Sequence, residues 1–227
     1  APTKSSTNSD PEIMKNGREL LNNVQKKGLK HYKDSLLKIP RSEMIEHNNF
    51  LNKIATSLNH KITISVAGSY RRGLSSSGDI DVLIKQEDND LETLNKFVNK
   101  LKDSNYIIED YVYGDKKFQG MCKLKGHSHA RRLDLLFTTI EEYPFALFYF
   151  TGSGTFNPKL RQIVMDKGYR LSEQGIYEID DKKKIKNQIH TDKDGKPFRT
   201  EEDIFKFIGI PYIKPKNRNP ESLNSFD

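Results

Sequence analysis

The chain has 227 residues, of which 34% are hydrophobic and 30% charged, and its formal net charge is +7 with a pI near 9.2. This length can bury a real core, as one large domain or two small ones. The longest apolar run, around Phe145–Phe150, is far shorter than the about 20 residues of a membrane-spanning helix, and residues 1–10 are polar, unlike a signal peptide. We expect a soluble, intracellular protein of the nucleus or cytoplasm that is neither membrane-bound nor secreted.

Cysteine usage and charge narrow the classes of site. The single cysteine, Cys122, excludes an internal disulfide and any zinc site built on cysteine pairs, and fits a reducing compartment. It lies between apolar residues of a strand-like run, which favours a buried core position. The positive net charge indicates a polyanionic partner only if the predicted site also requires a phosphate-containing substrate.

The amino-terminal third is predicted to be helical. Residues 1–10 have the composition of a disordered leader, and a helical pattern runs from Pro11 to about Gln25. Gly28 is expected to interrupt it, with a short helix over Lys30–Leu37. Pro40 then introduces a stronger helix. Its predicted buried face consists of Met44, Leu51, Ile54, Ala55 and Leu58.

The middle of the chain alternates strands and helices. Ile62, Ile64 and Val66 alternate with polar or small residues, which is typical of a strand. A turn, Gly68–Gly73, and a Ser/Gly loop lead into a second strand, Ile80–Lys85. An amphipathic helix is marked by Leu91, Leu94, Phe97, Val98 and Leu101. Three further strands are predicted near Ile107–Tyr113, Phe118–Leu124 and Arg132–Thr138.

The last third is predicted to be a separate α+β unit. Tyr143–Phe150 and Asn157–Lys167 are expected to be helices, and Gly168 to end the second of them. The inward residues of that second helix are Leu160, Ile163 and Val164. A small β region, Leu171–Ile179, is followed by the lysine-rich run Lys182–Lys186. Thr200 and Asp203 form an approximate capping box before a last helix that contains Ile204, Phe205, Phe207 and Ile208.

The sharpest local feature is the sequence GSYRRGLSSSGDIDVLI, from Gly68 to Ile84. Asp79 and Asp81 stand two residues apart at the start of a strand, so their side chains point to the same face. Two adjacent carboxylates repel each other unless cations share the site, and hard oxygen ligands suit Mg²⁺ or Mn²⁺.

An Asp-x-Asp pair alone is more often a solvated loop end, but its neighbours favour a site. The apolar residues that follow would take the strand into the core, which places the acids at its mouth. Backbone N–H groups at Gly68, Ser69, Gly73 and Gly78 could approach a phosphate closely. Arg71 and Arg72 lie on the same turn and could donate charge-assisted hydrogen bonds to phosphate oxygens.

A third acid is expected on an adjacent strand, and Asp134 in ARRLDLLF is the best candidate. An unpaired carboxylate in so apolar a strand is costly, and metal coordination would explain it. The alternative is a structural salt bridge to Arg131 or Arg132. Three carboxylates, a glycine-rich turn and arginines fit two-metal phosphoryl transfer, and the absence of GxxxxGK[ST] disfavours a P-loop enzyme.

These residues resemble the catalytic signature of the family X DNA polymerases, which belong to the polymerase-beta-like nucleotidyltransferase superfamily. Other segments resemble the family in the same order, from residue 12 to 218: GLKHYKDSLLKIPRSEM, RRLDLLF, YFTGSGTFNPKLR and PYIKPKNR. The resemblance implies an α+β fold, with a palm built on a mixed or antiparallel sheet. It implies a disordered leader (1–10), a helical DNA-binding segment (11–60), the catalytic palm (61–142) and a C-terminal nucleotide-selection subdomain (143–227).

The resemblance also implies roles for individual residues. Asp79, Asp81 and Asp134 would hold two Mg²⁺ ions, with Mn²⁺ as a substitute, and Asp134 would activate the primer 3′ hydroxyl. The nucleotide-binding positions would be Arg41, Gly68, Ser69, Arg72, Ser77, Gly78, Tyr149, Phe150, Gly152 and Asn157. Tyr149 would exclude a 2′ hydroxyl. The DNA-binding positions would be Arg132, Arg161 and Glu173, and Gly152–Ser153 is a candidate for a cis peptide.

Several of these residues have structural interpretations as well. Tyr149 and Phe150 belong to an aromatic stripe with Phe145 and Phe148 that could be core. Asn157 could cap a helix that has Pro158 at its first position. The run Lys182–Lys186 is typical of a solvated hairpin, with DNA contact as the alternative.

The sequence also departs from the family. Residues 1–27 match neither its helix-hairpin-helix segments nor its amino-terminal lyase domain, as expected of a minimal polymerase or of a shortened chain. Gly154 and Pro158 stand where many relatives carry larger or basic residues, so base pairing would be checked less strictly.

Three functions remain open. The first is a monomeric, template-directed polymerase that fills gaps in DNA repair, including base excision repair, with primer-template or gapped DNA and deoxynucleoside triphosphates as its partners. The second is a template-independent terminal transferase or RNA-tailing enzyme, although such family members typically carry Gly-Trp at Tyr149-Phe150. The third is an inactive nucleic-acid-binding module, which three intact acids argue against.

Overall fold

The computed structural model describes residues 22–226. The predicted leader (1–10) and most of the helix predicted from Pro11 lie outside them. The first described elements are helices α2 (Asn23–Lys30) and α3 (Tyr32–Ser35), and Asn22 and Gln25 form a capping box at the start of α2. The predicted break at Gly28 is wrong, because α2 continues through it. Glycine costs a helix only about 1 kcal/mol relative to alanine, and the capping box of Asn22 and Gln25 stabilises the start of this one.

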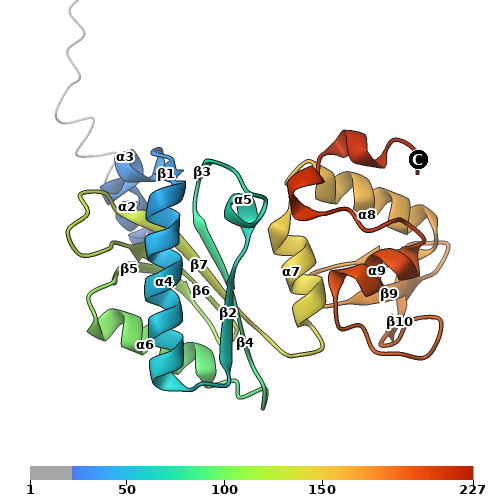
Figure 1. Cartoon of the computed structure of the whole chain (residues 1–227), viewed down its shortest axis with the longest axis horizontal. Helices are drawn as coiled ribbons and strands as arrows, with labels where there is room; N and C mark the ends of the chain where they lie inside the picture. The colour runs from blue at the N-terminus through green and yellow to red at the C-terminus, as the bar shows by residue number, and fades with distance from the viewer. Residues whose placement is uncertain (1–21, 227) are drawn as a thin grey trace, which may run out of the picture.

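A five-stranded mixed sheet forms the centre of the first unit (Figure 1). Its strand order is β2-β4-β7-β6-β5, in which β4 and β7 are parallel and the other neighbours are antiparallel. The elements are β1 (Ile39–Pro40), α4 (Arg41–Leu58), β2 (Ile62–Val66), α5 (Gly68–Arg71), β3 (Ser76–Ser77), β4 (Ile80–Gln86), α6 (Thr93–Asp103), β5 (Ile107–Tyr113), β6 (Lys117–Cys122) and β7 (Arg131–Thr138). The predicted turn at Gly68–Gly73 is therefore a short helix.

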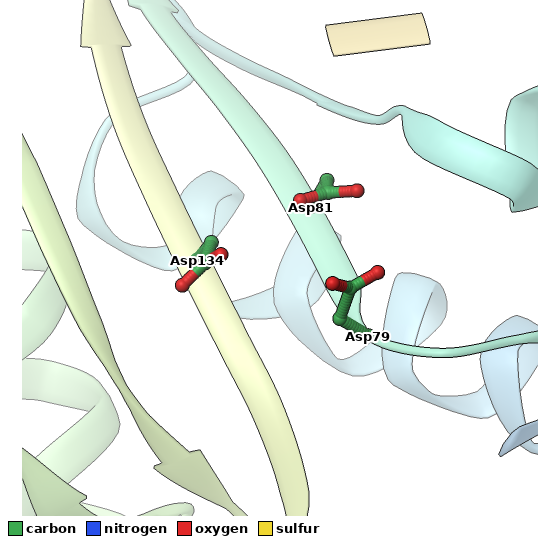
Figure 2. Close-up of side chains that lie close together, drawn as sticks. All are labelled: Asp79, Asp81 and Asp134. Carbon is green, nitrogen blue, oxygen red and sulfur yellow. The ribbon is translucent and has the colours of Figure 1, made fainter. Parts of the chain in front are cut away.

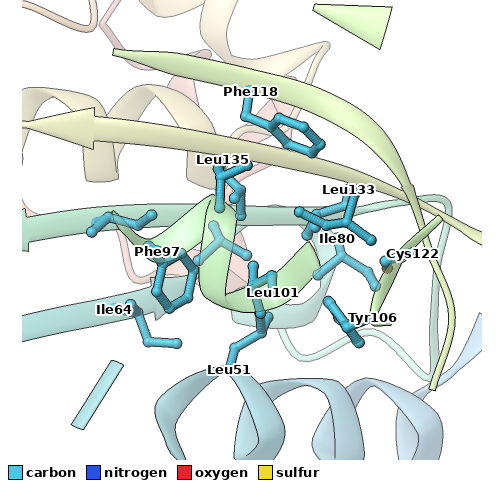
Figure 3. Packing of buried hydrophobic residues seen from close by; sticks show 14 of the residues in the cluster. Leu51, Ile64, Ile80, Phe97, Leu101, Tyr106, Phe118, Cys122, Leu133 and Leu135 are labelled. Atoms are coloured by element: carbon cyan, nitrogen blue, oxygen red, sulfur yellow. The ribbon is translucent and has the colours of Figure 1, made fainter. Parts of the chain in front are cut away.

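Alternation along the strands divides the sheet into an apolar face and a polar face. Ile80, Val82 and Ile84 of β4 point into a core with Leu133 and Leu135 of β7. Helices α4 and α6 cover this face, and Figure 3 shows Leu51, Phe97 and Leu101 packing against the strands. The predicted burial of Cys122 is confirmed. Helix α4 belongs to the predicted helical segment (11–60), but it packs into the same hydrophobic core as the sheet. The alternate residues of β4 and β7, which lie between these apolar ones, point to the opposite face of the sheet.

The second unit has its own core. It consists of α7 (Tyr143–Thr151), α8 (Phe156–Asp166), β8 (Tyr169–Leu171), β9 (Ile176–Ile179), β10 (Ile185–Ile189), α9 (Glu201–Ile208), and the short 3₁₀ helices η1 (Pro215–Asn217) and η2 (Pro220–Leu223). The predicted capping box of Thr200 and Asp203 is present, and α8 ends just before Gly168 as predicted. Residues 182–186 are exposed at the β9–β10 turn. In Figure 1, α7 lies between the first sheet and the rest of this unit.

The predicted α+β fold is confirmed. Between residues 22 and 226, no helix combines the length and the apolar character needed to cross a membrane.

Candidate functional site

Three carboxylates meet on the polar face of the sheet (Figure 2). Asp79 immediately precedes β4, and Asp81 is the second residue of that strand. Asp134 of β7 is the direct register partner of Asp81, because the two strands pair in parallel. One oxygen of each carboxylate lies within 4.8 Å of the others. The alternation that buries Ile80 and Val82 is thus what brings the acids together.

The site concentrates negative charge in a half-buried position. Burial, with the charges of Asp79 and Asp134 added to it, raises the pKa of Asp81 to about 7. Burial also raises the pKa of Asp134, against a hydrogen bond of 3.1 Å that Gln119 Nε2 donates to its carboxylate. Arg132 forms an ion pair with Asp79 and so neutralises part of this charge. The acids therefore form a cluster of negative charge that the described side chains only partly neutralise.

The alternative in which Asp134 forms a structural salt bridge to a neighbouring arginine is wrong. Arg131 points to the opposite face and donates two hydrogen bonds of 2.7 Å to Glu43. Arg132 contacts Asp79 instead.

The donor set fits a divalent metal ion. Three carboxylate oxygens within reach of one point are the hard ligands that Mg²⁺ and Mn²⁺ prefer. The backbone approaches closely at Gly68, where φ is +55° and a Cβ atom would collide with Asp81 Oδ2. A larger residue there would push the carboxylate out of the cluster.

A cavity of about 590 Å³ opens beside the acids and joins the two units. On one side it is lined by the α5 turn and by the acids; on the other it is lined by the end of α7 and the start of α8. The predicted residues that line it are Gly68, Ser69, Arg72, Gly78, Asp79, Asp81, Tyr149, Phe150, Gly152, Asn157 and Arg161. Asp134 is not a lining residue, but one of its carboxylate oxygens lies within 4.8 Å of those of Asp79 and Asp81, which are.

Lys38 is a lining residue that the sequence analysis missed. Its ammonium lies 3.6 Å from the position that a Cβ on Gly78 would occupy. It reaches this point because β1 pairs with β3, so that Ile39 is the register partner of Ser77. Strands β1 and β3 have only two residues each, which is too short to produce a recognisable alternation in the sequence. The only available signal was a basic residue just before the Ile39–Pro40 pair.

Besides Asp134, four predicted positions do not line this cavity. Arg41 stands behind the α5 turn, where Nη1 donates to the carbonyls of Tyr70 (2.9 Å) and Leu74 (3.2 Å). Ser77 lies in β3 and is buried. Arg132 lies on the exposed side of Asp79. Glu173 lines an adjoining cavity of about 240 Å³ that also contains Tyr149 and Arg161.

The wall opposite the turn comes from the end of α7. Phe145 and Phe148 are buried in the second core, whereas Tyr149 and Phe150 are half-exposed in the cavity, so the aromatic stripe divides between the two roles. The predicted cis peptide at Gly152–Ser153 is present. A Cβ on Gly152 would lie only 2.9 Å from Arg72 Nη1, which shows how closely the wall and the turn approach.

Asn157 is not a helix N-cap, because α8 begins one residue earlier, at Phe156. Its Nδ2 donates to the carbonyl of Tyr149 at 2.7 Å. Its Oδ1 is buried and has no hydrogen-bond partner within residues 22–226. Asn157 therefore fixes the end of α7 and leaves one acceptor available.

Comparison with known proteins finds the same two units. Residues 38–140 match the family profile described as DNA polymerase beta palm, and residues 146–219 match DNA polymerase beta thumb. The chain is 30% identical over 228 residues to DNA polymerase lambda of Arabidopsis thaliana, which covers 92% of this chain and 41% of the relative. It is 32% identical over 204 residues to DNA polymerase lambda of Rattus norvegicus, covering 85% and 35%.

A third relative is DNA nucleotidylexotransferase of Xenopus laevis, 27% identical over 248 residues, covering 92% of this chain and 46% of the relative. The chain thus spans less than half the length of each of these curated relatives.

Proposed function

Since the chain belongs to family X of the DNA polymerases, we propose that it is a DNA-directed DNA polymerase that adds deoxynucleotides to a primer 3′ hydroxyl. The observation that carries the proposal is the convergence of Asp79, Asp81 and Asp134 beside a cavity that has a glycine-containing, arginine-bearing turn on one side and an aromatic wall on the other. A triphosphate needs cations and N–H donors, whereas a sugar and base need a flat apolar wall. The two sides of the cavity offer these two kinds of surface.

The carboxylates would hold two Mg²⁺ ions, or Mn²⁺ in their place. Bound ions of this kind lower the pKa of the attacking hydroxyl and neutralise the triphosphate and the leaving pyrophosphate. Asp134 would orient the primer 3′ hydroxyl and accept its proton. Burial raises the pKa of this carboxyl group, which makes its carboxylate a stronger base than an exposed one.

The other residues would position the nucleotide. Ser69, Arg72 and the Gly78 backbone would hold the triphosphate, with Lys38 above Gly78 as a further cation. We propose that Arg41 acts on this turn from behind, through its bonds to the carbonyls of Tyr70 and Leu74. Ser77, which is buried in β3, would support the same turn.

The far wall would select the sugar and the base. Tyr149 would exclude a 2′ hydroxyl, and Phe150 and Gly152 would flank the sugar and the base. Asn157 would face the minor-groove edge of the base, to whose acceptors its Nδ2 could donate the hydrogen that the Tyr149 carbonyl does not accept. Arg161 would contact the template strand. Glu173 lies in the adjoining cavity and would help to fix the helix that carries Arg161, and exposed Arg132 would approach the primer strand.

We further propose gap filling in DNA repair inside the cell. Two of the relatives above bear the name DNA polymerase lambda, and the net charge of +7 suits a DNA partner. Terminal transfer is the second candidate, since a third relative is named DNA nucleotidylexotransferase. The pair Tyr149–Phe150 at the sugar wall favours templated synthesis.

Primer extension distinguishes these functions. Each deoxynucleotide is supplied singly to gapped, blunt-ended and single-stranded DNA, with Mg²⁺ present. Extension of the gapped substrate by the complementary nucleotide alone supports a templated polymerase. Extension of the single strand by any nucleotide would replace it with terminal transfer. Binding of all three substrates without extension would leave only a nucleic-acid-binding module.

A further inference from the structure

A second cavity, the helix-side cavity, lies among the helices that cover the apolar face of the first sheet. It has a volume of about 560 Å³ and is lined by α4, by the C-terminal end of α6 and by the segment that follows β6. The three carboxylates stand on the other, polar face of that sheet. Among the described residues, none lines both this cavity and the nucleotide cavity. The proposed nucleotide chemistry therefore leaves the helix-side cavity without a role.

The floor of the helix-side cavity is apolar and firmly held. The rings of Phe50 and Tyr106 pack with their centroids 4.7 Å apart, at an angle of 32°. Tyr106 is only 2% exposed, its hydroxyl lies 2.6 Å from His47 Nδ1, and Figure 3 shows it beside Cys122. Phe50 and Leu124 are half-buried and pack against the same core. These two side chains therefore present apolar surface that can receive a group without rearrangement of the floor.

The rim is closed by a tight turn that is tied to α4. The turn runs from Leu124 to His127, whose backbone N–H donates to the Leu124 carbonyl at 3.1 Å. Gly126 takes a φ of +88° at the third position of this turn, where glycine is favoured. His127 Nε2 lies 3.0 Å from the carboxylate of Glu46 on α4. A cavity whose walls are already ordered binds a ligand at a smaller entropic cost than a mobile one.

The rim carries unpaired positive charge on the β6 side. Lys123 and Lys125 are exposed, and neither ammonium group forms an ion pair or a hydrogen bond with any residue between 22 and 226. Among the described residues that line the cavity, Glu46 carries the only carboxylate, and His127 already contacts it. The cavity is therefore complementary to a ligand that brings its own negative charges to the two lysines.

The arrangement of these charges suits carboxylates better than phosphates. Compact phosphate sites usually contain a helix N-terminus, a glycine-rich backbone or a guanidinium group, and the described residues that line the helix-side cavity provide none of these. Instead, α6 presents its C-terminal end at Ser104, where the partial charge of the helix is negative. Two separate ammonium groups beside an apolar floor fit a chain that offers carboxylates on either side of a large apolar side chain.

We propose that the helix-side cavity binds a short acidic segment of a partner protein. One large apolar side chain of that segment packs on Phe50 and Leu124, and the flanking carboxylates pair with Lys123 and Lys125. Because the sheet separates this cavity from the three carboxylates, the bound segment leaves the nucleotide cavity open. The proposal does not depend on the polymerase function.

Fluorescence anisotropy measures the binding of four fluorescein-labelled probes to the full chain. The first is a peptide with one phenylalanine between two pairs of glutamates. In the second peptide serine replaces the phenylalanine, and in the third lysines replace the glutamates. The fourth probe is a short oligothymidylate, which represents single-stranded DNA. Each titration is run with and without an excess of unlabelled gapped DNA.

Three variants are compared with the wild type. The rim variant, Lys123→Glu with Lys125→Glu, reverses the two charges of the rim, and Phe50→Ala removes the ring from the floor. The control variant, Lys182→Glu with Lys184→Glu, reverses two exposed lysines with the same spacing at the β9–β10 turn. Thermal unfolding shows that each variant is folded.

The phenylalanine peptide should bind the wild type with a Kd below about 1 mM, equally with and without gapped DNA. The rim variant should raise this Kd at least about tenfold, because two attractions become repulsions. Serine in the peptide and Phe50→Ala should each raise it about tenfold, because the apolar contact is lost. The control variant should stay within about twofold, since distant charges are screened, and the lysine peptide should not bind.

Equal binding of the phenylalanine and serine peptides overturns the proposal, and so does an equal loss of binding in the rim and control variants. Displacement of the peptide by gapped DNA would show that it occupies the DNA surface instead. If the peptide does not bind, and the rim variant alone abolishes binding of oligothymidylate, the cavity is a site for single-stranded DNA. If Phe50→Ala does not fold, the serine peptide and the rim variant decide.

Discussion

The raised pKa of Asp81 makes the stability of the protein depend on pH and metal together. Burial beside Asp79 and Asp134 moves this pKa from 3.8 to about 7 in the folded, metal-free protein. The folded state therefore retains a proton that the unfolded chain has already released. The stability associated with this proton is fully present below about pH 4 and is lost as pH rises through about 7.

The magnitude follows from the difference between the two pKa values. A change from 3.8 to about 7 corresponds to about 4 kcal/mol of destabilisation in the fully ionised, metal-free site. For a protein of this size, that is an appreciable part of a total stability of roughly 5–15 kcal/mol. A divalent ion replaces the proton and removes the repulsion, so Mg²⁺ should stabilise the protein more at high pH than at low pH.

Thermal unfolding tests this dependence. The melting temperature is measured at about pH 6 and about pH 8, with and without saturating Mg²⁺, and the Mg²⁺-induced rise should be clearly larger at the higher pH. Asp81→Asn removes the titrating group, so that variant should lose most of the Mg²⁺ effect and be more stable than the metal-free wild type at high pH. Asp90→Asn changes a half-exposed acid that pairs with Lys96 away from the cluster; it is the control, and its response to Mg²⁺ should match that of the wild type. Equal Mg²⁺ stabilisation at both pH values in the wild type would refute the reasoning.

Three further predictions concern the cavity and the DNA surface. Lys38→Ala should raise the KM for deoxynucleotides by roughly three- to tenfold with little change in kcat, since it removes one cation from the triphosphate side; an unchanged KM would exclude Lys38 from the site. Tyr149→Ala should narrow the preference for dGTP over GTP opposite template C by about tenfold or less, since the ring supplies only part of the exclusion; a wild type that uses both equally would show that Tyr149 is no sugar gate. DNA affinity should fall steeply with salt as Lys and Arg contacts release counterions, and a salt-independent Kd would contradict the basic-surface argument.

The acid cluster could be predicted from the sequence because its geometry is local. Asp79 and Asp81 share a face through the two-residue period of a strand, and the apolar residues between and after them identify the buried face. Asp134 could be assigned because a carboxylate interrupts an otherwise apolar strand. Its register with Asp81 depends on the parallel pairing of β4 with β7, which the structure supplies.

Other features depend on contacts between distant segments and could not be predicted in this way. Lys38 reaches the cavity through a pairing of two very short strands, and Arg41 turns away because it bonds the carbonyls of Tyr70 and Leu74. Glu201 follows a capping threonine at the start of an amphipathic helix, where an acidic residue is ordinary. Only the folded chain shows that it is buried against two arginines.

The central claim is templated nucleotide addition by the three carboxylates. Its most direct test is extension of a one-nucleotide gap by wild type and Asp134→Asn, with Mg²⁺ and each nucleotide in turn, beside a DNA-binding titration of both proteins. The wild type should insert the complementary nucleotide, and Asp134→Asn should lose at least ~10²-fold in rate while binding DNA nearly as tightly. Near-normal turnover in Asp134→Asn, or insertion by the wild type that ignores the template base, would contradict the account.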